Sequence, residues 1–409
     1  MTRAIKVAGV IEVVGIGEAG WEALGPHERS LVERARLVMG GARHLEFLPE
    51  IEGQERRAWP SPLRPALPGL AREPGPVVVL ASGDPLRSGI GTTLIEVLGA
   101  DSVSIYPTVS SDLLARARMG WSAESVQVIT LVGRDIDRVV RWLTPGARLI
   151  VLCGDGDGPA RVADRVSAAG YGDSAMTAWW HLGGPREGSS TATAATWGPE
   201  PTPDLVLVCL EVADGGADQG PAPGRSEDAF DHDGQITKRD VRASALAHLR
   251  PTPGQVLWDL GAGSGAVGIE WALAAPGALT VAVERDLERA ARVEANAARL
   301  GVPEAVTVVT GETIEVLGAL PSPDAVFFGG GVDRDVLAAA WSRLPIGGRC
   351  VVHAVTLEAE EVCLAAFREH GGSLTRLSVE HAEALGRYLS WKPARPITQW
   401  SATKIDPLT

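Results

Sequence analysis

A glycine-rich stretch follows an acidic residue at 257–270, LWDLGAGSGAVGIE. Asp259 comes two residues before Gly261, and Gly263 and Gly265 follow at alternate positions. Glycine has no Cβ, so a backbone containing it can turn tightly and approach a ligand closely. A turn of this kind between a strand and a helix predicts a site for a nucleotide-like cofactor.

A second acid helps to distinguish between possible cofactors. Glu284 ends the next apolar run, 19 residues after Gly265, where its carboxylate could accept hydrogen bonds from both hydroxyls of a ribose. Asp-x-Gly-x-Gly-x-Gly with such a downstream acid is typical of proteins that bind S-adenosylmethionine. An NAD-dependent oxidoreductase that uses the same turn stays open as an alternative. So do a regulatory module that only binds the cofactor and a purely structural turn.

The apolar run at 324–331, DAVFFGGG, ends in glycines. Methyltransferases that modify amines or bases often have Asn/Asp-Pro-Pro-Tyr at this place, and glycines there instead suit a bulky substrate.

Residues 1–210 contain 20 basic and 24 acidic side chains, and residues 236–409 contain 17 and 20. With no broad basic face, we expect no nucleic-acid partner.

The first half contains a second pair of glycine motifs. Gly15, Gly17 and Gly20 form GxGxxG in VVGIGEAG, but the apolar run that follows, ARLVMGG, has no acid at its end. A later apolar run ends in SGDP at 82–85, and a simple type I turn is the alternative explanation for it. The occurrence of both motifs at strand ends favours a ligand site there.

Apolar runs alternate with helix-like segments through both halves, which predicts α/β domains with parallel sheets. We place a first domain at 1–210, a flexible Gly/Pro-rich acidic linker at 211–230 and a second, Rossmann-like domain at 231–409. Residues 211–235 contain seven acidic side chains and one basic side chain. SLTRLSVEHAEAL and RPITQWSATK near the end are expected to form a hairpin-like edge.

The four cysteines are far apart and have apolar surroundings, so no metal is expected. They are expected to be buried thiols of a cytoplasmic protein. No stretch has the roughly 20 apolar residues of a membrane helix. The first residues are better explained as a strand than as a signal peptide, because Glu12 and a glycine turn interrupt the apolar run.

Longer motifs resemble two enzyme families. VVGIGEAG, ASGDPLRSGIGTTL and YPTVSSDLLARARMGWSAESVQVITLVGR resemble the tetrapyrrole methylases that act on corrin rings. FDHDGQITKRDVRA, LWDLGAGSGAVGIE, VTVVTGE, FFGGG and AVTLE resemble the decarboxylating precorrin methyltransferases. Their order in one chain resembles the precorrin-6Y C5,15-methyltransferase (decarboxylating) family of cobalamin synthesis, and the match covers nearly everything except residues 211–230.

The resemblance implies a tetrapyrrole-methylase-like α/β domain that methylates C-5 of an anionic precorrin. It also implies a Rossmann-like class I methyltransferase domain that methylates C-15 and decarboxylates the C-12 acetate, giving precorrin-8. Each domain would bind one S-adenosylmethionine. The implied cofactor residues are Gly83, Asp84, Leu86 and Ser111 in the first domain, and Thr237, Gly261, Ala262, Gly263, Ser264, Gly265, Glu284 and Thr313 in the second.

Where the family commonly reads Gly-Glu/Asp-Ala-Pro, this chain reads Gly-Glu-Thr-Ile at 311–314, so an adenine contact at Thr313 would be made by its backbone. His232, Lys238 and Arg239 are the catalytic candidates, with both cations able to pair with substrate carboxylates. The alternative for them is a solvated charge run before a helix. His353 and His381 are further candidates whose alternative is a structural role, and we expect a homo-oligomer formed through the second domain.

Overall fold

The computed structural model describes residues 9–216, 220 and 222–406. Its contacts divide the chain into two compact units, which are described separately. The first unit contains residues up to Arg134 and Pro145–Asp214, and the second contains Asp135–Thr144 and the residues from Gly215 onward. The division after Asp214 falls inside the predicted linker, three residues beyond the end of the last strand of the first unit, β10 (Val206–Glu211).

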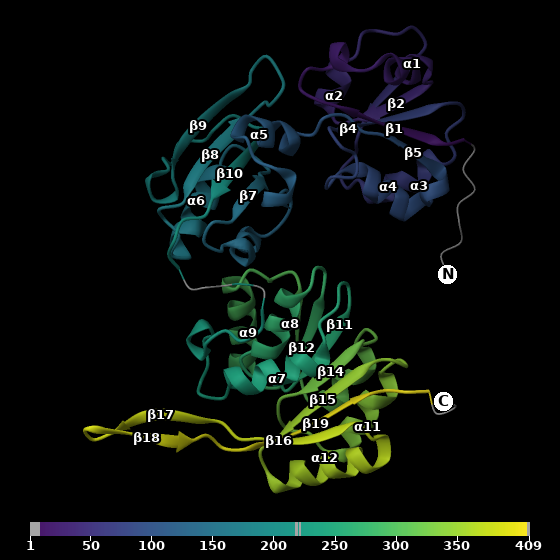
Figure 1. Ribbon diagram of the computed structural model, residues 1–409. Coiled ribbons are helices and arrows are strands. Elements are labelled where there is room, and N and C mark those ends of the chain that lie inside the picture. Colours follow the sequence, from purple (N-terminus) through teal and green to yellow (C-terminus); the bar gives the residue numbers. More distant parts are fainter. Residues whose placement is uncertain (1–8, 217–219, 221, 407–409) are drawn as a thin grey trace. The chain divides into compact units, whose positions relative to one another are not determined.

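The first sheet of the first unit is parallel and has the order β3-β2-β4-β1-β5. Its strands are β1 (Ile11–Ile16), β2 (Leu37–Gly40), β3 (Glu55–Ala58), β4 (Val77–Ser82) and β5 (Val103–Tyr106). Helices α1 (Pro26–Arg34) and α2 (Ala42–Glu46) contribute to the core on one face, and α3 (Leu67–Leu70) and α4 (Ile90–Leu98) to the core on the other (Figure 1). Since both faces are covered, the central strands are continuous apolar runs.

The second sheet of the first unit is mixed, with the order β6-β7-β10-β8-β9. Only β6 (Val126–Thr130) and β7 (Arg148–Leu152) pair in parallel; β8 (Ala175–Trp180), β9 (Gly188–Thr193) and β10 are antiparallel to their neighbours. Helices α5 (Ser111–Met119) and α6 (Gly158–Ala168) pack on this sheet. The predicted parallel strands are therefore only part of this unit.

The second unit has a seven-stranded sheet of order β13-β12-β11-β14-β15-β19-β16. Five of the strands are parallel: β11 (Val256–Leu260), β12 (Leu279–Glu284), β13 (Val306–Thr310), β14 (Ala325–Phe328) and β15 (Arg349–Ala354). Strand β19 (Ile397–Thr403) is antiparallel to both of its neighbours, β15 and the edge strand β16 (Ser373–Leu377). The strand order reverses between β11 and β14, and such a reversal opens a crevice at the carboxyl ends of the strands.

Helices cover both faces of this sheet. The core on one face contains side chains of α7 (Arg239–Leu249), α8 (Ala266–Ala274) and α9 (Leu287–Arg299). The core on the other face contains side chains of α11 (Arg334–Arg343) and α12 (Leu357–His370). The predicted fold class is confirmed, because the second unit is Rossmann-like and both units are α/β.

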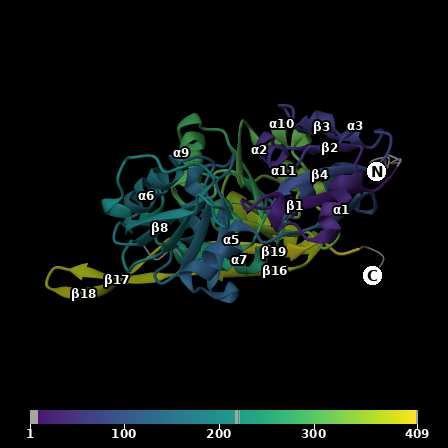
Figure 2. The ribbon, with the colours of Figure 1, turned by 90° about the horizontal axis from the view of Figure 1, so that it is seen from above.

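A two-stranded hairpin, β17 (Glu380–Leu385) and β18 (Tyr388–Pro393), lies between β16 and β19 in the chain. It extends away from the seven-stranded sheet of its unit in both views (Figures 1 and 2), and every residue of the two strands is exposed. The predicted antiparallel edge therefore exists as β16 and β19, but a separate projecting hairpin is inserted between them.

Residues 224–230 of the predicted linker pack against the second unit. Arg225 and Phe230 are buried, with exposed fractions of 7% and 3%. The backbone N–H groups of Gly224 and Arg225 donate to the buried Glu270 carboxylate over 3.0 and 2.8 Å. Arg242, also fully buried, forms an ion pair with Glu270 at 3.1 Å. This segment is thus part of the core of the second unit.

Candidate cofactor-binding and catalytic sites

The two glycine motifs of the first unit lie side by side. Strands β1 and β4 are adjacent, with Ile16 opposite Ser82, so their carboxyl ends meet at one edge of the sheet. The N–H of Gly83 donates to the carbonyl of Ile16 over 3.2 Å. A Cβ on Gly15 would lie 2.0 Å from the carbonyl oxygen of Gly83, so no larger residue fits there. The pairing of these motifs expected from the sequence is therefore present in the fold.

The residues of the SGDP motif form a turn, and two of them, Gly83 and Asp84, also line a cavity. Gly83 has φ +53°, and a Cβ there would lie 2.8 Å from the Cα of Ser110. Asp84 accepts the N–H of Leu86 on its carboxylate over 2.9 Å, and its carbonyl accepts the N–H of Arg87 over 3.0 Å. The predicted type I alternative thus matches the local i to i+3 hydrogen bond, and the same turn faces a pocket.

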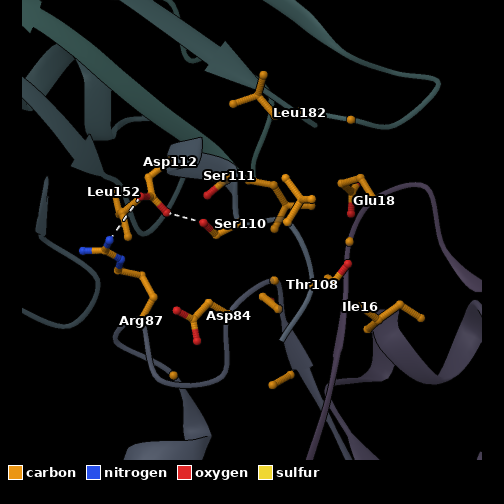
Figure 3. A pocket seen from close by; sticks show the side chains of 18 of the residues that line it. Ile16, Glu18, Asp84, Arg87, Thr108, Ser110, Ser111, Asp112, Leu152 and Leu182 are labelled. Atoms are coloured by element: carbon orange, nitrogen blue, oxygen red, sulfur yellow. Dashed lines mark hydrogen bonds and ion pairs between the residues drawn. The ribbon is translucent and has the colours of Figure 1, made fainter. Parts of the chain in front are cut away.

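A cavity of about 640 Å³ lies at this edge, between the two sheets of the first unit (Figure 3). Gly83, Asp84 and Ser111 line it together. Leu86 is not among the lining residues, and its side chain is 48% exposed. Asp112 is buried beside Ser111 and accepts the Ser110 hydroxyl over 2.6 Å, which fixes the start of α5.

The same cavity has a group of polar residues that the sequence did not single out. Glu18, Arg43, His44 and Ser82 all line it. Glu18 is the residue after Gly17 in GxGxxG, so the motif was noticed for its glycines while its charged member was passed over. The other members come from α2 and the end of β4, and only the fold brings them together.

In the second unit, the backbone of the glycine turn is bonded to the neighbouring strand. The N–H groups of Gly261 and Ala262 both donate to the carbonyl of Val283 over 3.0 Å. The N–H of Gly263 donates to the carboxylate of Glu284 over 2.8 Å. Gly261, Gly263 and Gly265 have φ values of +72°, +59° and +75°, a region that favours glycine.

Asp259 stabilises the turn from inside the sheet. It is 1% exposed, and its carboxylate accepts the N–H of Gly268 over 2.9 Å. A Cβ on Gly268 would lie 2.9 Å from the same carboxylate oxygen, so this contact needs glycine. Burial raises the pKa of Asp259 to about 7, and the nearby negative charge of Glu284 adds to the effect.

Glu284 ends β12, and Thr313 follows the carboxyl end of the neighbouring strand β13. Glu284 is opposite Thr310 in the sheet, and its carbonyl accepts the N–H of Gly311 over 3.1 Å. Glu284 is buried, with 6% of the residue exposed, and its carboxylate also accepts the N–H of Asp286 over 3.1 Å. Thr313 begins the short helix α10 (Thr313–Val316) directly after this loop.

Asn296 joins the segment before α7 to the glycine turn, a role that the sequence did not reveal. This fully buried side chain donates to the carbonyls of Asp231 and Ser264, both over 2.9 Å, and accepts the N–H of Asp231 over 2.8 Å. The carbonyl of Gln235 lies 3.4 Å from where a Cβ of Gly263 would be. The segment from 231 therefore passes close to the turn.

The catalytic candidates lie on or beside this segment. His232 accepts the N–H of Gly234 on Nδ1 over 2.9 Å. The carbonyl of Thr237 accepts a bond from the buried Arg242 over 2.5 Å. Lys238 caps α7, and Arg239 is its first residue; both are exposed. Thr237 and both cations thus directly follow the segment that passes the turn, and the two cationic side chains are accessible to an anion.

The two remaining histidines differ in environment. His353 is 4% exposed in β15; its Nε2 lies 2.9 Å from the amide oxygen of Gln399, and its ring packs edge-on against Phe327. Burial lowers the pKa of His353 to about 4. His381 lies on the exposed hairpin, 3.9 Å from Asp240. These surroundings fit a structural role for His353.

Within 9–216, 220 and 222–406, no group of three or more His, Cys, Asp or Glu side chains is arranged to hold a metal ion. Among the helices of that same part of the chain, none combines the length and the apolar character needed to span a bilayer. All four cysteines are buried and form no disulfide.

Comparison with known proteins identifies both units. Residues 10–196 match the family model of tetrapyrrole (corrin/porphyrin) methylases, and residues 228–404 match a precorrin methyltransferase domain. A probable cobalt-precorrin-6B C(15)-methyltransferase (decarboxylating) from Pyrobaculum calidifontis is 35% identical over 40% of this chain and 85% of its own length. The C-terminal domain of precorrin-6Y C5,15-methyltransferase from Rhodobacter capsulatus is 41% identical and covers 45% of this chain and 100% of its own, with a TM-score of 0.44.

Two relatives match this chain over nearly its whole length. The precorrin-6Y C(5,15)-methyltransferase [decarboxylating] of a Sinorhizobium species is 44% identical over 96% of both chains. The protein of the same name from Mycobacterium tuberculosis is 40% identical over 97% of this chain and 100% of its own. These matches give no support to an NAD-dependent oxidoreductase or to a regulatory module without activity. The chain belongs to the family of precorrin-6Y C5,15-methyltransferases (decarboxylating).

Proposed function

We propose that the two units divide the reaction. The first unit binds one S-adenosylmethionine and methylates C-5 of an anionic precorrin. The second unit binds another, methylates C-15 and decarboxylates the C-12 acetate, so that precorrin-6B becomes precorrin-8. The observation that carries this proposal is that each unit has its own glycine turn at the carboxyl edge of its own parallel sheet. The names of the full-length relatives support the pair of methylations.

The residues of the second unit fit an adenosyl cofactor. The donor supplies a methyl group already activated as a sulfonium, so the protein has mainly to position the reactants and exclude water. The Glu284 carboxylate, which fixes Gly263 and Asp286 through single hydrogen bonds, keeps acceptor capacity for ribose hydroxyls. Thr313, which follows the end of the neighbouring strand, would contact the adenine, and Ala262 and Ser264 complete the turn.

The first unit offers Gly83, Asp84 and Ser111 around a cavity of about 640 Å³. A volume of this size lies in the usual range for a small-molecule ligand. Leu86 belongs to this proposed site through its backbone, because its N–H holds the Asp84 carboxylate. No metal is assigned to either reaction.

Decarboxylation needs a place for the leaving carboxylate and a route for a proton. Lys238 and Arg239 would hold substrate carboxylates, since both are exposed at the start of α7. His232 uses Nδ1 internally, which leaves Nε2 for the substrate. We assign these three residues to the second unit's reaction.

Incubation of the protein with reduced precorrin-6 and isotopically labelled S-adenosylmethionine tests the proposed function. The expected product has two labelled methyl groups and lacks one carbon dioxide. Transfer of a single methyl group, or of none, by active protein would contradict it. Calorimetric titration should show two S-adenosylmethionine sites per chain.

The units should also fold and bind separately, although the exact cut matters. Fragments 1–214 and 215–409 are cut at the Asp214 boundary of the two units, and the short segment Asp135–Thr144 of the second unit stays in the first fragment. A fragment starting at Asp231 would lack the buried Phe230 and the two N–H donors to Glu270. Loss of partners for a buried carboxylate is strongly destabilising, so 231–409 should be less stable than 215–409 in urea. Equal midpoints would show that this segment contributes nothing.

We assign the homo-oligomer to the β17–β18 hairpin and propose a second copy of the chain as its partner. Leu385, Tyr388, Leu389 and Trp391 are between 65% and 77% exposed. An isolated two-stranded hairpin with exposed apolar side chains is only marginally stable in water, and a second copy would cover it. Trp391→Glu should lower the mass measured by light scattering, whereas Glu380→Gln should not. An unchanged mass for Trp391→Glu would count against this partner.

The remaining assignments follow the chemistry. A soluble precorrin substrate and the four buried, unbridged thiols suit a reducing cytoplasm. The acidic overall charge of −13 gives no electrostatic basis for a nucleic-acid partner.

A further inference from the structure

Five polar residues, which we call the Glu18 cluster, meet at one side of the cavity in the first unit. They are Glu18, Arg43, His44, Ser82 and His181. Glu18 follows β1, and Arg43 and His44 belong to α2. His181 comes directly after β8, so it reaches the cluster from the second sheet of the same unit. Figure 3 shows Glu18 on the opposite side of the pocket from Asp112 and Arg87.

Both carboxylate oxygens of Glu18 have a partner. Oε1 accepts a hydrogen bond from Arg43, and Oε2 lies 2.8 Å from Nδ1 of His181. The Glu18 side chain is only 10% exposed. A Cβ on Gly184 would lie 2.7 Å from the Cβ of Glu18, so glycine there lets the Glu18 side chain pack closely. The carboxylate is therefore held in one position.

His181 is held in an unusual backbone conformation. Its φ is +49°, in the left-handed region that residues other than glycine seldom adopt. Such a conformation costs on the order of 1–3 kcal/mol and persists where the surrounding structure determines it. Here the conformation places the imidazole against Glu18, and His181 as a whole is 7% exposed.

The chemistry of the first unit requires a proton acceptor. When a methyl group replaces hydrogen on a ring carbon, the new C–C bond forms as the S–C bond of the sulfonium breaks. The carbon then loses its hydrogen as a proton, and the C–H electron pair restores the ring double bond. A group in the pocket has to receive this proton, and a positioned side chain is the usual means.

Few of the titratable side chains lining the described pocket qualify. Asp84 belongs to the proposed cofactor turn. The Asp112 side chain is only 2% exposed, against 10% for Glu18, so its carboxylate is less accessible to a substrate. Arginine does not lose its proton in proteins. The Cys153 thiol also lines the pocket, but burial raises its pKa to about 12, so it already holds its proton at neutral pH. Among the lining residues that the structure describes, these exclusions leave Glu18 and His44.

His44 is neutral and can donate a hydrogen bond only from Nδ1. Its Nε2 lies 3.0 Å from a guanidinium nitrogen of Arg43, which can only donate, so Nε2 accepts and the ring proton is on Nδ1. Burial and the charge of Arg43 lower the pKa of His44 to about 4, which makes it a poor acceptor of a further proton. Its Nδ1 is buried without a hydrogen-bond partner in the described chain.

We propose that Glu18 accepts the proton released from C-5 after methylation, and that Arg43 and His181 are its positioning residues. This inference rests on the proposed function, in which the first unit methylates C-5. The methyl group moves from sulfur to carbon, the proton moves from carbon to a carboxylate oxygen of Glu18, and solvent later takes it away.

The test compares Glu18→Gln with Glu22→Gln in the full chain. Glutamine keeps the shape of Glu18 and an oxygen acceptor for Arg43 but lacks the carboxylate. Glu22, whose side chain is 86% exposed, is the matched control. Glu18→Gln should slow C-5 methylation by about 10²–10⁴-fold, the usual contribution of a general base. S-adenosylmethionine affinity, C-15 methylation and decarboxylation should stay unchanged, and Glu22→Gln should match the unsubstituted protein.

A substrate with deuterium at C-5 separates a catalytic role from a structural one. In Glu18→Gln, loss of the proton should become the slow step, so the primary isotope effect should exceed that of the unsubstituted protein. Should Glu18→Gln not fold, Glu18→Asp keeps a carboxylate one methylene shorter and should show a smaller rate loss with the same rise in isotope effect. Normal C-5 methylation, or a slow reaction with an unchanged isotope effect, would overturn the proposal. Absence of C-5 methylation in the unsubstituted protein would instead contradict the proposed function.

Discussion

Gly15 in the first unit and Gly263 in the second each lie at the carboxyl end of a central parallel strand. A Cβ on Gly15 would lie 2.0 Å from a carbonyl oxygen, and its φ is outside the left-handed region. Gly263 has φ +59°, but a Cβ there would lie 3.4 Å from its nearest neighbour, an ordinary contact. The first glycine is therefore required by close packing, and the second by backbone conformation.

Glycines in two similar motifs can therefore be required for different physical reasons. In the first unit, two strand ends press against each other, and the pocket is lined by side chains from both sheets. In the second unit, two carboxylates hold the backbone of the turn and of the helix that follows it. Glu284, at a strand end, accepts the N–H of Gly263, and the buried Asp259 accepts the N–H of Gly268. A contiguous motif therefore defines the second site far more completely than the first.

Alanine substitutions within GxGxxG test the packing half of this comparison and should have the largest effect. Gly15→Ala should leave no folded first unit, because overpacking against backbone cannot be relieved by a side-chain rotation. Gly17→Ala should be within about 0.5 kcal/mol of the unsubstituted protein, as nothing lies within 4 Å of its Cβ position. Urea denaturation of fragment 1–214 measures both. Equal stabilities would show that close packing is not what requires Gly15.

Asp259→Asn tests the buried acid, which belongs to the second turn alone. The pKa of Asp259 is raised to about 7 in the folded state, so the carboxyl's contribution to stability is full below about pH 4 and is lost as pH rises through 7. Asparagine keeps an acceptor for Gly268 and does not titrate. The variant should gain stability relative to the unsubstituted protein between pH 4 and 8, by up to about 4 kcal/mol.

The measurement is the difference in unfolding free energy between the two ligand-free proteins at each pH. Subtraction removes the titration of groups that both proteins share. A difference that stays constant from pH 4 to 8 would mean that Asp259 is ionised throughout this range.

Glu284→Ala should have a smaller effect that is confined to the second site. Each charge-assisted hydrogen bond to a ribose hydroxyl contributes about 1.5–3 kcal/mol, so S-adenosylmethionine affinity should fall by at least about tenfold. The first site should be unaffected, and Glu288→Ala, an exposed change on α9, should leave both sites intact. Calorimetry that finds two unchanged sites in Glu284→Ala would refute the assignment.

The elements predicted best are those whose local sequence determines their environment. A parallel strand with helices on both faces has few polar residues, so it appears in the sequence as a continuous apolar run. The runs VVVLAS and VLWDL have this pattern and form buried parallel strands. Strands β3 and β9, ERRA and GSSTAT, are sheet edges without an apolar pattern, so the sequence gives no signal for them. The exposed β17–β18 hairpin was likewise missed as a separate element.

The candidate sites divide in the same way. The turn at 261–265 and Glu284 could be predicted because they are adjacent strand ends within one motif. Glu18 and His181 are 163 residues apart and meet only through the packing of two sheets. Asn296, inside α9, gives no sign in the sequence that it joins residues 231 and 264. Contacts that depend on tertiary packing leave no local pattern.

The central claim is that each unit performs its own methylation, and mass spectrometry of the products of two full-length variants tests it most directly. Gly263→Val should give a product with one added methyl group, about 14 Da, and no loss of carbon dioxide, because valine strains the left-handed turn of the second unit. Asp84→Ala should give a product with one methyl group that has lost carbon dioxide, about 44 Da, since Asp84 and its hydrogen-bond partner Leu86 both belong to the first unit. If either change abolishes both methyl transfers in folded protein, the units do not divide the reaction.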